Sequence, residues 1–432
     1  MRVAFYTLGC KLNQAETESL ASQFSQSAFE LVSPDDVADI YIANTCTVTH
    51  VADRKSRHWL RLARRRNPRA LIIATGCYAQ RSHQELTQLT DLVVDNTDKE
   101  HLLEIVRGLR LEGRGLGEGG TKQSQVSATA RTRALTKIQD GCHGLCTYCV
   151  VPKVRPHEYS PPVSQIIDEV RQKVALGYKE VVLTGTKIGN YKDTTLSASE
   201  GPGASLTDLL RRILNDSNIE RLRLSSLQPS EISSELLALW QDERLCRHFH
   251  LALQSGSETV LRRMKRSYSL DEYHRALSLI KEAIPQVAIT TDIMVGFPGE
   301  GDAEFEQSYS FCQQAGFANI HVFPFSPRPE TLAARMPKQI QSEIKEKRKQ
   351  RMLELSQSSQ RGFCERFLGQ TMSVLWEKET DAASGINSGL TGNYIRVFAH
   401  SEEPVSNKIT PVKLHKLHDH AIWGEIVNED PR

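Results

Sequence analysis

The sequence predicts an α/β protein with a small N-terminal parallel-sheet domain, a central partial (β/α)6 barrel and a small C-terminal β-barrel. Apolar runs alternate with amphipathic stretches over residues 1–110, as in an open parallel sheet. The alternation becomes regular over 132–363, where six strand-like runs would curve into a partial barrel. Short strand-like runs separated by Gly, Ser and Asn over 366–428 favour a β-barrel of the kind used on RNA. The intervening 111–131, rich in Gly, Ser, Thr and Gln, is predicted to be a linker.

The composition excludes several classes of protein. The chain has 432 residues, a formal net charge of +2 and nine cysteines. That length can bury the cores of two or three domains, and so few cysteines in so long a chain do not make a disulfide scaffold. No apolar run is long enough to span a bilayer, and the first residues lack the pattern of a signal peptide. We therefore expect a cytoplasmic protein with no membrane partner, whose reduced thiols can bind metal.

Three cysteines lie on one short loop after the first strand predicted for the central barrel. Cys142, Cys146 and Cys149 have the spacing C-x3-C-x2-C, which allows three thiolates to converge on one metal centre. Structural zinc sites and ordinary ferredoxin clusters use four protein ligands. Three cysteines therefore indicate a [4Fe-4S] cluster with one iron open to a ligand other than protein. A zinc loop completed by a distant His is the alternative interpretation.

A second set of three cysteines follows three predicted strands of the N-terminal domain. The runs at 3–8, 40–45 and 71–75 lead to Cys10, Cys46 and Cys77. Parallel strands end at one edge of a sheet, so these thiols should meet where open α/β folds place their ligands. The fourth strand carries no cysteine, which leaves this set also one ligand short. The alternative is three buried free thiols, which are common in protein cores.

Two further segments are candidate RNA contacts. Seven basic residues and no acid lie between Arg54 and Arg66, and helical spacing places four of them on one face: Arg54, Arg57, Arg61 and Arg64. This cationic face either is simply solvated or contacts an RNA phosphate backbone. In the tail, Tyr394, Arg396 and Phe398 alternate on one predicted strand and share a face that either stacks bases or belongs to the core.

Small and polar residues follow successive strands of the central barrel. Gln254 and Ser255 come after the fourth strand, and Gly296 and Glu300 after the fifth. Such residues at the carboxyl ends of strands allow close approach of a nucleoside and supply hydrogen bonds to it, although each could equally mark a plain turn. We take these four as the candidate cofactor-binding residues.

These motifs resemble the methylthiotransferase family of radical S-adenosylmethionine enzymes over essentially the whole chain. The stretches at 7–14, 44–49 and 75–80 are similar to the family's three auxiliary-cluster motifs, and the tail is similar to its TRAM domain. Gly-Cys-Lys-Leu-Asn-Gln at 9–14 most resembles the bacterial branch that acts on N6-threonylcarbamoyladenosine at tRNA position 37. The chain departs from the family at 153–159, where fewer Arg occur than in the family's usual run.

The resemblance implies a transferase that methylthiolates C2 of that adenosine with two [4Fe-4S] clusters and S-adenosylmethionine. The cluster on Cys142, Cys146 and Cys149 would cleave the cofactor to a 5'-deoxyadenosyl radical that abstracts hydrogen. The auxiliary cluster on the other three cysteines would then supply sulfur. The tRNA anticodon stem-loop is the expected partner, and a flavodoxin or ferredoxin the expected electron donor.

Two rival functions remain open from the sequence. One is the same chemistry on isopentenyladenosine in tRNA or on an aspartate of a ribosomal protein. The other is a zinc-dependent RNA-binding protein without catalysis. Metal analysis separates this last class, because two clusters give about eight iron atoms per chain.

Overall fold

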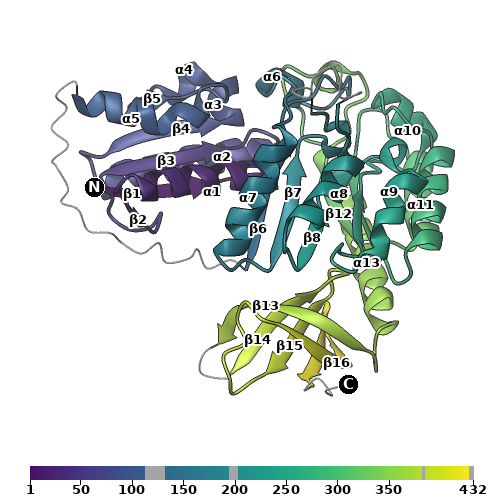
Figure 1. Cartoon of the computed structure of the whole chain (residues 1–432). Helices are drawn as coiled ribbons and strands as arrows, with labels where there is room; N and C mark the ends of the chain where they lie inside the picture. The colour runs from purple at the N-terminus through teal and green to yellow at the C-terminus, as the bar shows by residue number, and fades with distance from the viewer. Residues whose placement is uncertain (112–131, 194–202, 382–384, 428–432) are drawn as a thin grey trace.

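A computed structural model describes residues 1–111, 132–193, 203–381 and 385–427. Within these residues the strands form an N-terminal sheet, two central sheets and a closed C-terminal barrel, arranged as Figure 1 shows. The predicted α/β fold class is confirmed. The predicted linker at 111–131 falls, apart from its first residue, outside the described residues. None of the described helices is both long and apolar enough to cross a membrane.

The N-terminal sheet is parallel, with the strand order β2-β1-β3-β4-β5. Its strands are β1 (Arg2–Thr7), β2 (Glu30–Val32), β3 (Ile40–Thr45), β4 (Leu71–Gly76) and β5 (Leu92–Val93). Its helices are α1 (Lys11–Gln26), α2 (His50–Arg66), α3 (Cys77–Arg81), α4 (His83–Leu86) and α5 (Leu102–Leu111). β3 and β4 are buried along their whole length, which explains their nearly continuous apolar sequence. The short β2 was not predicted.

Six parallel strands form the curved wall of the central part, in the two sheets β6-β7-β8 and β9-β10-β11-β12. The strands are β6 (Arg133–Gln139), β7 (Glu180–Gly185), β8 (Arg221–Leu224), β10 (His248–Leu251), β11 (Ala288–Val295) and β12 (Asn319–Pro324), with the two-residue β9 (Ser226–Leu227) at an edge. The helices are α6 (Val151–Val154), α7 (Val163–Ala175), α8 (Leu206–Asp216), α9 (Ser234–Ala238), α10 (Glu258–Arg263), α11 (Leu270–Ala283), α12 (Asp302–Ala315) and α13 (Ser342–Glu365). An isolated bridge joins Leu222 of β8 to Leu245, which lies just before β10.

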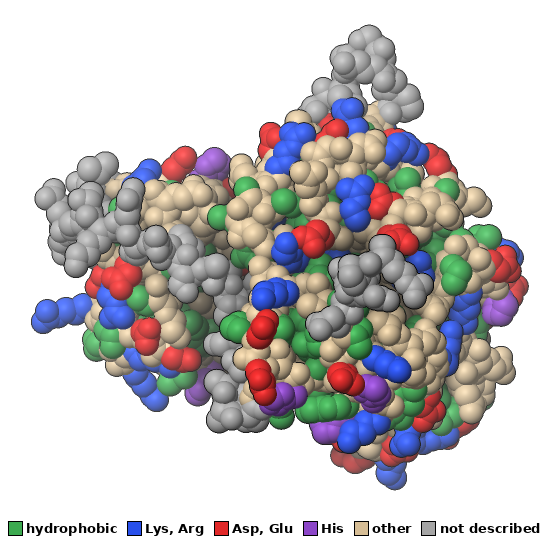
Figure 2. All heavy atoms as spheres, turned by 60° about the horizontal axis from the view of Figure 1, so that its bottom comes forward, with side chains coloured by type: hydrophobic (Ala, Val, Ile, Leu, Met, Phe, Trp, Pro, Cys, Tyr) green, Lys and Arg blue, Asp and Glu red, His purple; other side chains and the backbone are tan. Residues whose placement is uncertain are grey.

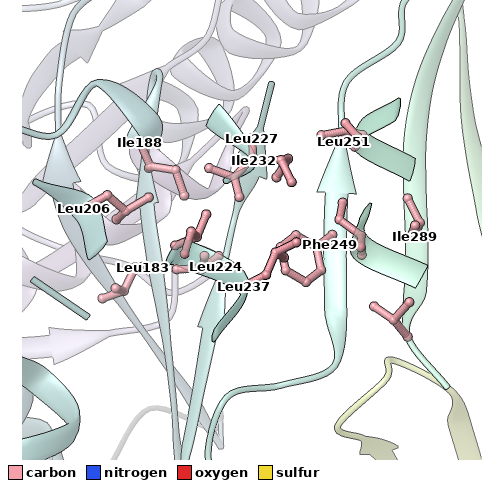
Figure 3. Close-up of a cluster of buried hydrophobic side chains, with 14 of the residues drawn as sticks. Leu183, Ile188, Leu206, Leu224, Leu227, Ile232, Leu237, Phe249, Leu251 and Ile289 are labelled. Carbon is pink, nitrogen blue, oxygen red and sulfur yellow. The ribbon is translucent and has the colours of Figure 1, made fainter. Parts of the chain in front are cut away.

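The two faces of this wall differ because strand side chains alternate. Leu183, Leu224, Phe249 and Ile289 belong to the apolar cluster between the strands and the helices outside them (Figure 3). Figure 1 shows α7, α8 and α11 on that outer side. The inner face carries polar side chains such as His248 and Thr290, and also the apolar Leu135 and Val182, which the N-terminal domain covers.

Helix α1 packs against the inner face of β6 and β7. Ala15 of α1 packs with Leu135 of β6 and Val182 of β7, two side chains that point inward. Because α1 begins directly after Cys10, this packing fixes where the edge of the N-terminal sheet meets the central part.

The C-terminal strands close into a barrel in the order β13-β14-β15-β17-β16. They are β13 (Thr371–Asp381), β14 (Ile386–Thr391), β15 (Arg396–His400), β16 (Ile409–His418) and β17 (Ala421–Ile426). The core includes Trp376, Val397 and Leu414. Arg221 and Arg223 of β8 donate to backbone carbonyls of the barrel, which attaches it to the central strands.

Candidate functional site

The three cysteines of the N-terminal sheet lie together at its carboxyl edge. Cys10 precedes α1, Cys46 follows β3 and Cys77 begins α3, and the three strands before them are neighbours in the sheet. Burial, and then the neighbouring Cys77 and Cys10 thiols, raise the pKa of Cys46 to about 12. Since the thiolate is the metal ligand, a bound cation must offset this cost.

Residues of the surrounding motifs hold these cysteine loops in place. The buried Asn13 side chain donates to the carbonyls of Leu8 at 2.9 Å and Thr45 at 3.1 Å, which joins the first two loops. At Gly9 the φ angle is 105°, and a Cβ atom would lie 2.7 Å from the Cβ of Cys46. Only glycine allows so close an approach in this conformation. The motif residues therefore bring the thiols together.

The second set lies on the loop between β6 and α6. Gly141 begins the loop with a φ of 74°, and a Cβ there would lie 2.0 Å from the carbonyl oxygen of His157. Burial, and then the nearby Cys146 and Cys142 thiols, raise the pKa of Cys149 to about 12. The Cys149 N–H also donates to the Cys146 carbonyl at 3.1 Å, which makes a tight turn between these two cysteines.

Arg155 connects the two cysteine sets. Its Nε donates to Sγ of Cys77 at 3.4 Å, and its carbonyl accepts from the N–H of Cys142 at 3.3 Å. Cys77 also packs against Val150 and Val154, which follow the cysteine loop in sequence. The two sets thus meet across the short helix α6. Arg155 was not predicted as a site residue, because its contact with Cys77 spans 78 positions.

A buried charge network surrounds this junction. The Arg155 guanidinium donates to Glu16 at 2.7 and 2.9 Å, to Asp140 at 2.7 and 2.8 Å, and to Asn13 at 3.0 Å. Lys99 donates to Glu16 at 2.6 Å. Burial alone would raise the pKa of Glu16, but Lys99 and Arg155 hold it well below its ordinary value. The network joins the N-terminal sheet to the central part through buried ion pairs.

The donor set suits a cluster better than a single ion. Within the described ranges, no three His, Cys, Asp or Glu side chains meet as ligands of one metal ion. A [4Fe-4S] cluster makes a different demand, because each thiolate binds a different iron and the thiolates surround the cluster. Each set also consists of thiols alone, the ligands that such clusters take.

The four residues predicted to bind the cofactor lie at the carboxyl ends of β10 and β11, but two are engaged internally. Ser255 is fully buried, and its hydroxyl is 3.1 Å from a serine hydroxyl of α12. Glu300 accepts from the Gly296 N–H at 2.8 Å and pairs with Arg348 at 2.8 Å. The backbone N–H of Gln254 donates to a carbonyl of β11 at 2.8 Å, and the φ angle of Gln254 is 68°. Ser255 and Glu300 therefore shape the strand ends.

A role for Arg266 or Glu231 was not predicted from the sequence. Arg266 donates to Sγ of Cys146 at 3.3 Å, and Lys187 lies 3.8 Å from Glu231. One guanidinium nitrogen of Arg266 and one carboxylate oxygen of Glu231 are buried without a hydrogen-bond partner among the described residues. A cation and a carboxylate with free bonding capacity fit the carboxylate and amino group of S-adenosylmethionine. No sequence motif marks either position.

The cationic face of α2 is partly used within the protein. Arg57 pairs with Glu85 at 3.1 Å, and Arg64 pairs at 2.6 Å with an aspartate just before β5. Arg54 and Arg61 are exposed. These two remain available to a phosphate backbone.

Tyr394 lies at the joint between the barrel and the central strands. It precedes β15 in a turn with a φ of 71°, and its ring stacks on that of His248 at 4.6 Å. Arg396 begins β15 and pairs with Glu377. Tyr394 therefore stacks within the protein. On the face shown in Figure 2, basic and acidic side chains are interspersed.

Comparisons with known proteins agree with this geometry. Residues 2–95 match a family described as Uncharacterized protein family UPF0004, and residues 136–312 match the Radical SAM superfamily. A relative from Bacillus subtilis (strain 168), named threonylcarbamoyladenosine tRNA methylthiotransferase MtaB, is 36% identical over 96% of this chain and 94% of its own. A relative from Syntrophotalea carbinolica (strain DSM 2380 / NBRC 103641 / GraBd1), named tRNA-2-methylthio-N(6)-dimethylallyladenosine synthase, is 31% identical over 98% of this chain and 100% of its own.

The fold is also similar to that of a solved structure. The radical S-adenosylmethionine methyltransferase TsrM from Kitasatospora setae, with cobalamin and a [4Fe-4S] cluster bound, aligns with a TM-score of 0.57. The alignment covers 77% of both chains at 14% identity, so it supports the fold alone. The family is shown by the relatives, one of which is 36% identical over 96% of this chain. The chain belongs to the methylthiotransferase family of radical S-adenosylmethionine enzymes.

Proposed function

We propose that this enzyme methylthiolates C2 of N6-threonylcarbamoyladenosine at position 37 of tRNA. The observation that carries the proposal is the meeting of two three-cysteine sets across α6, with Arg155 in contact with both. A C2–H bond of adenine is not activated for acid–base chemistry. Replacing its hydrogen with sulfur needs a radical and a sulfur source next to each other, and two adjacent clusters meet that requirement.

Each cysteine set is proposed to hold one [4Fe-4S] cluster with a single iron free of protein. Cys142, Cys146 and Cys149 would leave an iron open to S-adenosylmethionine, and Cys10, Cys46 and Cys77 an iron open to sulfur. When bound, these groups would supply a 5'-deoxyadenosyl radical that abstracts hydrogen, the sulfur that replaces it and, from a second S-adenosylmethionine, the methyl group. The protein supplies position and a site closed to water.

Charged side chains near the two cysteine sets would position the cofactor and the sets themselves. Arg266, which contacts Sγ of Cys146, would bind the carboxylate of S-adenosylmethionine, and Glu231, which has Lys187 3.8 Å away, would bind the amino group. Gln254, Ser255, Gly296 and Glu300 would form the strand ends against which the cofactor lies. Arg155 would keep the two cysteine sets at a fixed separation.

The substrate is proposed from the family and from one motif. Relatives of the chain bear names for two tRNA substrates, with 36% identity to one and 31% to the other. Gly-Cys-Lys-Leu-Asn-Gln at 9–14 favours the threonylcarbamoyl branch. Dimethylallyladenosine in tRNA is the second candidate, and a ribosomal-protein aspartate a more distant one.

The proposal also assigns partners and segments. The exposed Arg54 and Arg61 and the C-terminal barrel would hold the anticodon stem-loop, and a flavodoxin or ferredoxin would deliver electrons in the cytoplasm. In this proposal residues 1–110 hold the auxiliary cluster, residues 132–363 carry out the radical chemistry, and residues 366–428 bind RNA.

Single cysteine variants test the division of labour. Cys149→Ala should stop 5'-deoxyadenosine formation, whereas Cys46→Ala should still cleave the cofactor but form no methylthio nucleoside. Cys312→Ala is the matched control, because this thiol is fully buried outside both sets. Mass spectrometry of both products gives the answer. Equal loss of cleavage in Cys149→Ala and Cys46→Ala contradicts the proposal.

A further inference from the structure

All three parts of the chain contribute to a cavity of about 300 Å³ inside the curved wall. Its lining includes His248 of β10, Thr290 of β11 and His321 of β12, which alternate with the outward apolar residues of Figure 3. Tyr394 enters from the C-terminal barrel, and Lys11 from the N-terminal sheet. The cavity is therefore complete only when all three parts are assembled.

Lys11 is the cation of this cavity without a close counter-ion. Among the described residues no carboxylate lies within ion-pair distance of its ammonium group. Burial lowers the pKa of Lys11, and Tyr394 next to the cavity partly offsets this. Glu180 is already bound by Arg223 at 2.7 and 3.1 Å. Glu377 likewise pairs with Arg133 and Arg396. The cavity therefore carries an excess of positive charge.

The neighbouring side chains also have unused hydrogen-bonding atoms. His248 is bonded through Nε2 to Thr290 at 3.1 Å, and His250 through Nε2 to Asp292 at 3.1 Å. Nδ1 of both rings is buried without a hydrogen-bond partner in the part of the chain that the structure describes. Buried polar atoms are almost always satisfied, so these nitrogens point to a polar occupant. A metal ion is not indicated, because the described side chains form no group of ligands for one.

We propose that this cavity binds the free carboxylate of the substituent on N6 of the modified adenine, with Lys11 as its charge contact. The inference rests on the proposed function and deepens it, because Lys11 would select the substrate. A threonylcarbamoyl group carries a carboxylate and a hydroxyl, which match an ammonium group and free ring nitrogens. A dimethylallyl group is apolar and would leave the Lys11 charge desolvated and unpaired.

The position of Lys11 in the chain supports this assignment. It directly follows Cys10, a proposed ligand of the cluster that supplies sulfur. Its side chain lines the cavity, so the cavity begins one residue away from that cysteine.

Binding of labelled anticodon stem-loops to the reconstituted enzyme tests the proposal. The probes carry threonylcarbamoyladenosine, the same nucleoside with its carboxylate converted to a carboxamide, or dimethylallyladenosine. Fluorescence anisotropy at raised salt limits the phosphate contribution. The wild type should bind the carboxylate probe about tenfold tighter than the carboxamide, as expected for loss of a charge-assisted hydrogen bond. Lys11→Met should abolish that difference, and Lys11→Arg should keep most of it.

Further measurements separate the possible outcomes. Lys347→Met, at an exposed position of α13, is the matched control and should retain the difference. KM for the carboxylate probe should rise in Lys11→Met more than kcat falls. If Lys11→Met loses iron, the wild-type comparison of the first two probes decides alone. Equal wild-type affinity for them overturns the inference, and so does an equal weakening of all three probes by Lys11→Met, which would mean a phosphate contact.

A different result would contradict the proposed function itself. A wild type that methylthiolates the dimethylallyl probe and leaves the threonylcarbamoyl probe unchanged would overturn the proposed substrate, and the role of Lys11 with it.

Discussion

Replacing Arg155 with Met should loosen the junction between the two cysteine sets. The side chain is 3% exposed and donates to two carboxylates, an amide and a thiol. Methionine fills similar space without any of these bonds. Removing one partner of a buried ion pair costs about 3–5 kcal/mol, because the remaining charge stays buried.

The structure places the expected loss at the lower end of that range. Glu16 keeps Lys99 at 2.6 Å, and Asp140 keeps Lys137 at 3.6 Å, so neither carboxylate is left without a cation. We therefore expect a loss of about 3 kcal/mol, which is roughly a 150-fold change in the opening equilibrium of this region. A chain with several domains need not unfold in one step. The loss should therefore be measured as the local opening of this region.

Peptide-resolved hydrogen exchange of the metal-free protein measures this directly. Exchange should accelerate in α1 and in the loop that holds Cys142, Cys146 and Cys149, and remain unchanged in the C-terminal barrel. Arg171→Met is the matched control, since that side chain is 55% exposed and its ion pair contributes little. Unchanged exchange in α1 for Arg155→Met would refute the account of the network.

The effect of Arg155 should also depend on pH. The pKa of Glu16 is lowered in the folded protein, so its charge stabilises the fold above the unfolded pKa of about 4.3. That contribution is lost as the pH falls from there through the lower folded pKa. Arg155→Met brings the folded pKa closer to the unfolded one, so the difference between wild type and variant should be largest above pH 5 and shrink in acid.

Three further predictions concern the clusters, the cofactor and the RNA. Gly9→Ala should lower the iron content from about eight to about four atoms per chain, because its Cβ would displace a cluster cysteine; an unchanged iron content contradicts that reason. Arg266→Met should keep its iron but bind S-adenosylmethionine more weakly in equilibrium dialysis, and equal affinity would remove Arg266 from the cofactor site. Arg54→Glu and Arg61→Glu together should weaken stem-loop binding and flatten its salt dependence, whereas Arg57→Glu should mainly lower thermal stability through its lost partner. An unchanged salt slope in the double variant would mean that this face of α2 is only solvated.

The sequence predicted those features that follow from local pattern. Three strands that end in cysteines identify one sheet edge, because parallel strands share their direction. The strand β14 (Ile386–Thr391) was missed, since its Asn, Ser and Gly are typical of turns, and its place in the closed barrel makes it a strand. Tyr394 was placed on a strand by alternation, but the structure has it in the turn before β15.

The rest of the site depends on contacts between distant segments. Arg155, Arg266 and Glu231 carry no motif, and their roles appear only when the loop, the strand ends and the N-terminal sheet are brought together. Ser255 and Glu300 were correctly associated with strand ends, yet nothing in a sequence shows that their side chains bond inward. Burial and pairing are properties of the assembled fold.

The central claim is that two incomplete clusters lie next to each other, one on each cysteine set. Electron paramagnetic resonance of the reduced, reconstituted enzyme, combined with iron analysis, tests it most directly. We predict about eight iron atoms per chain and a spectrum broadened by coupling between two reduced clusters, with about four iron atoms and no broadening when either cysteine set is replaced by alanine. A wild type with only four iron atoms, or with zinc, or with two uncoupled signals, would contradict it.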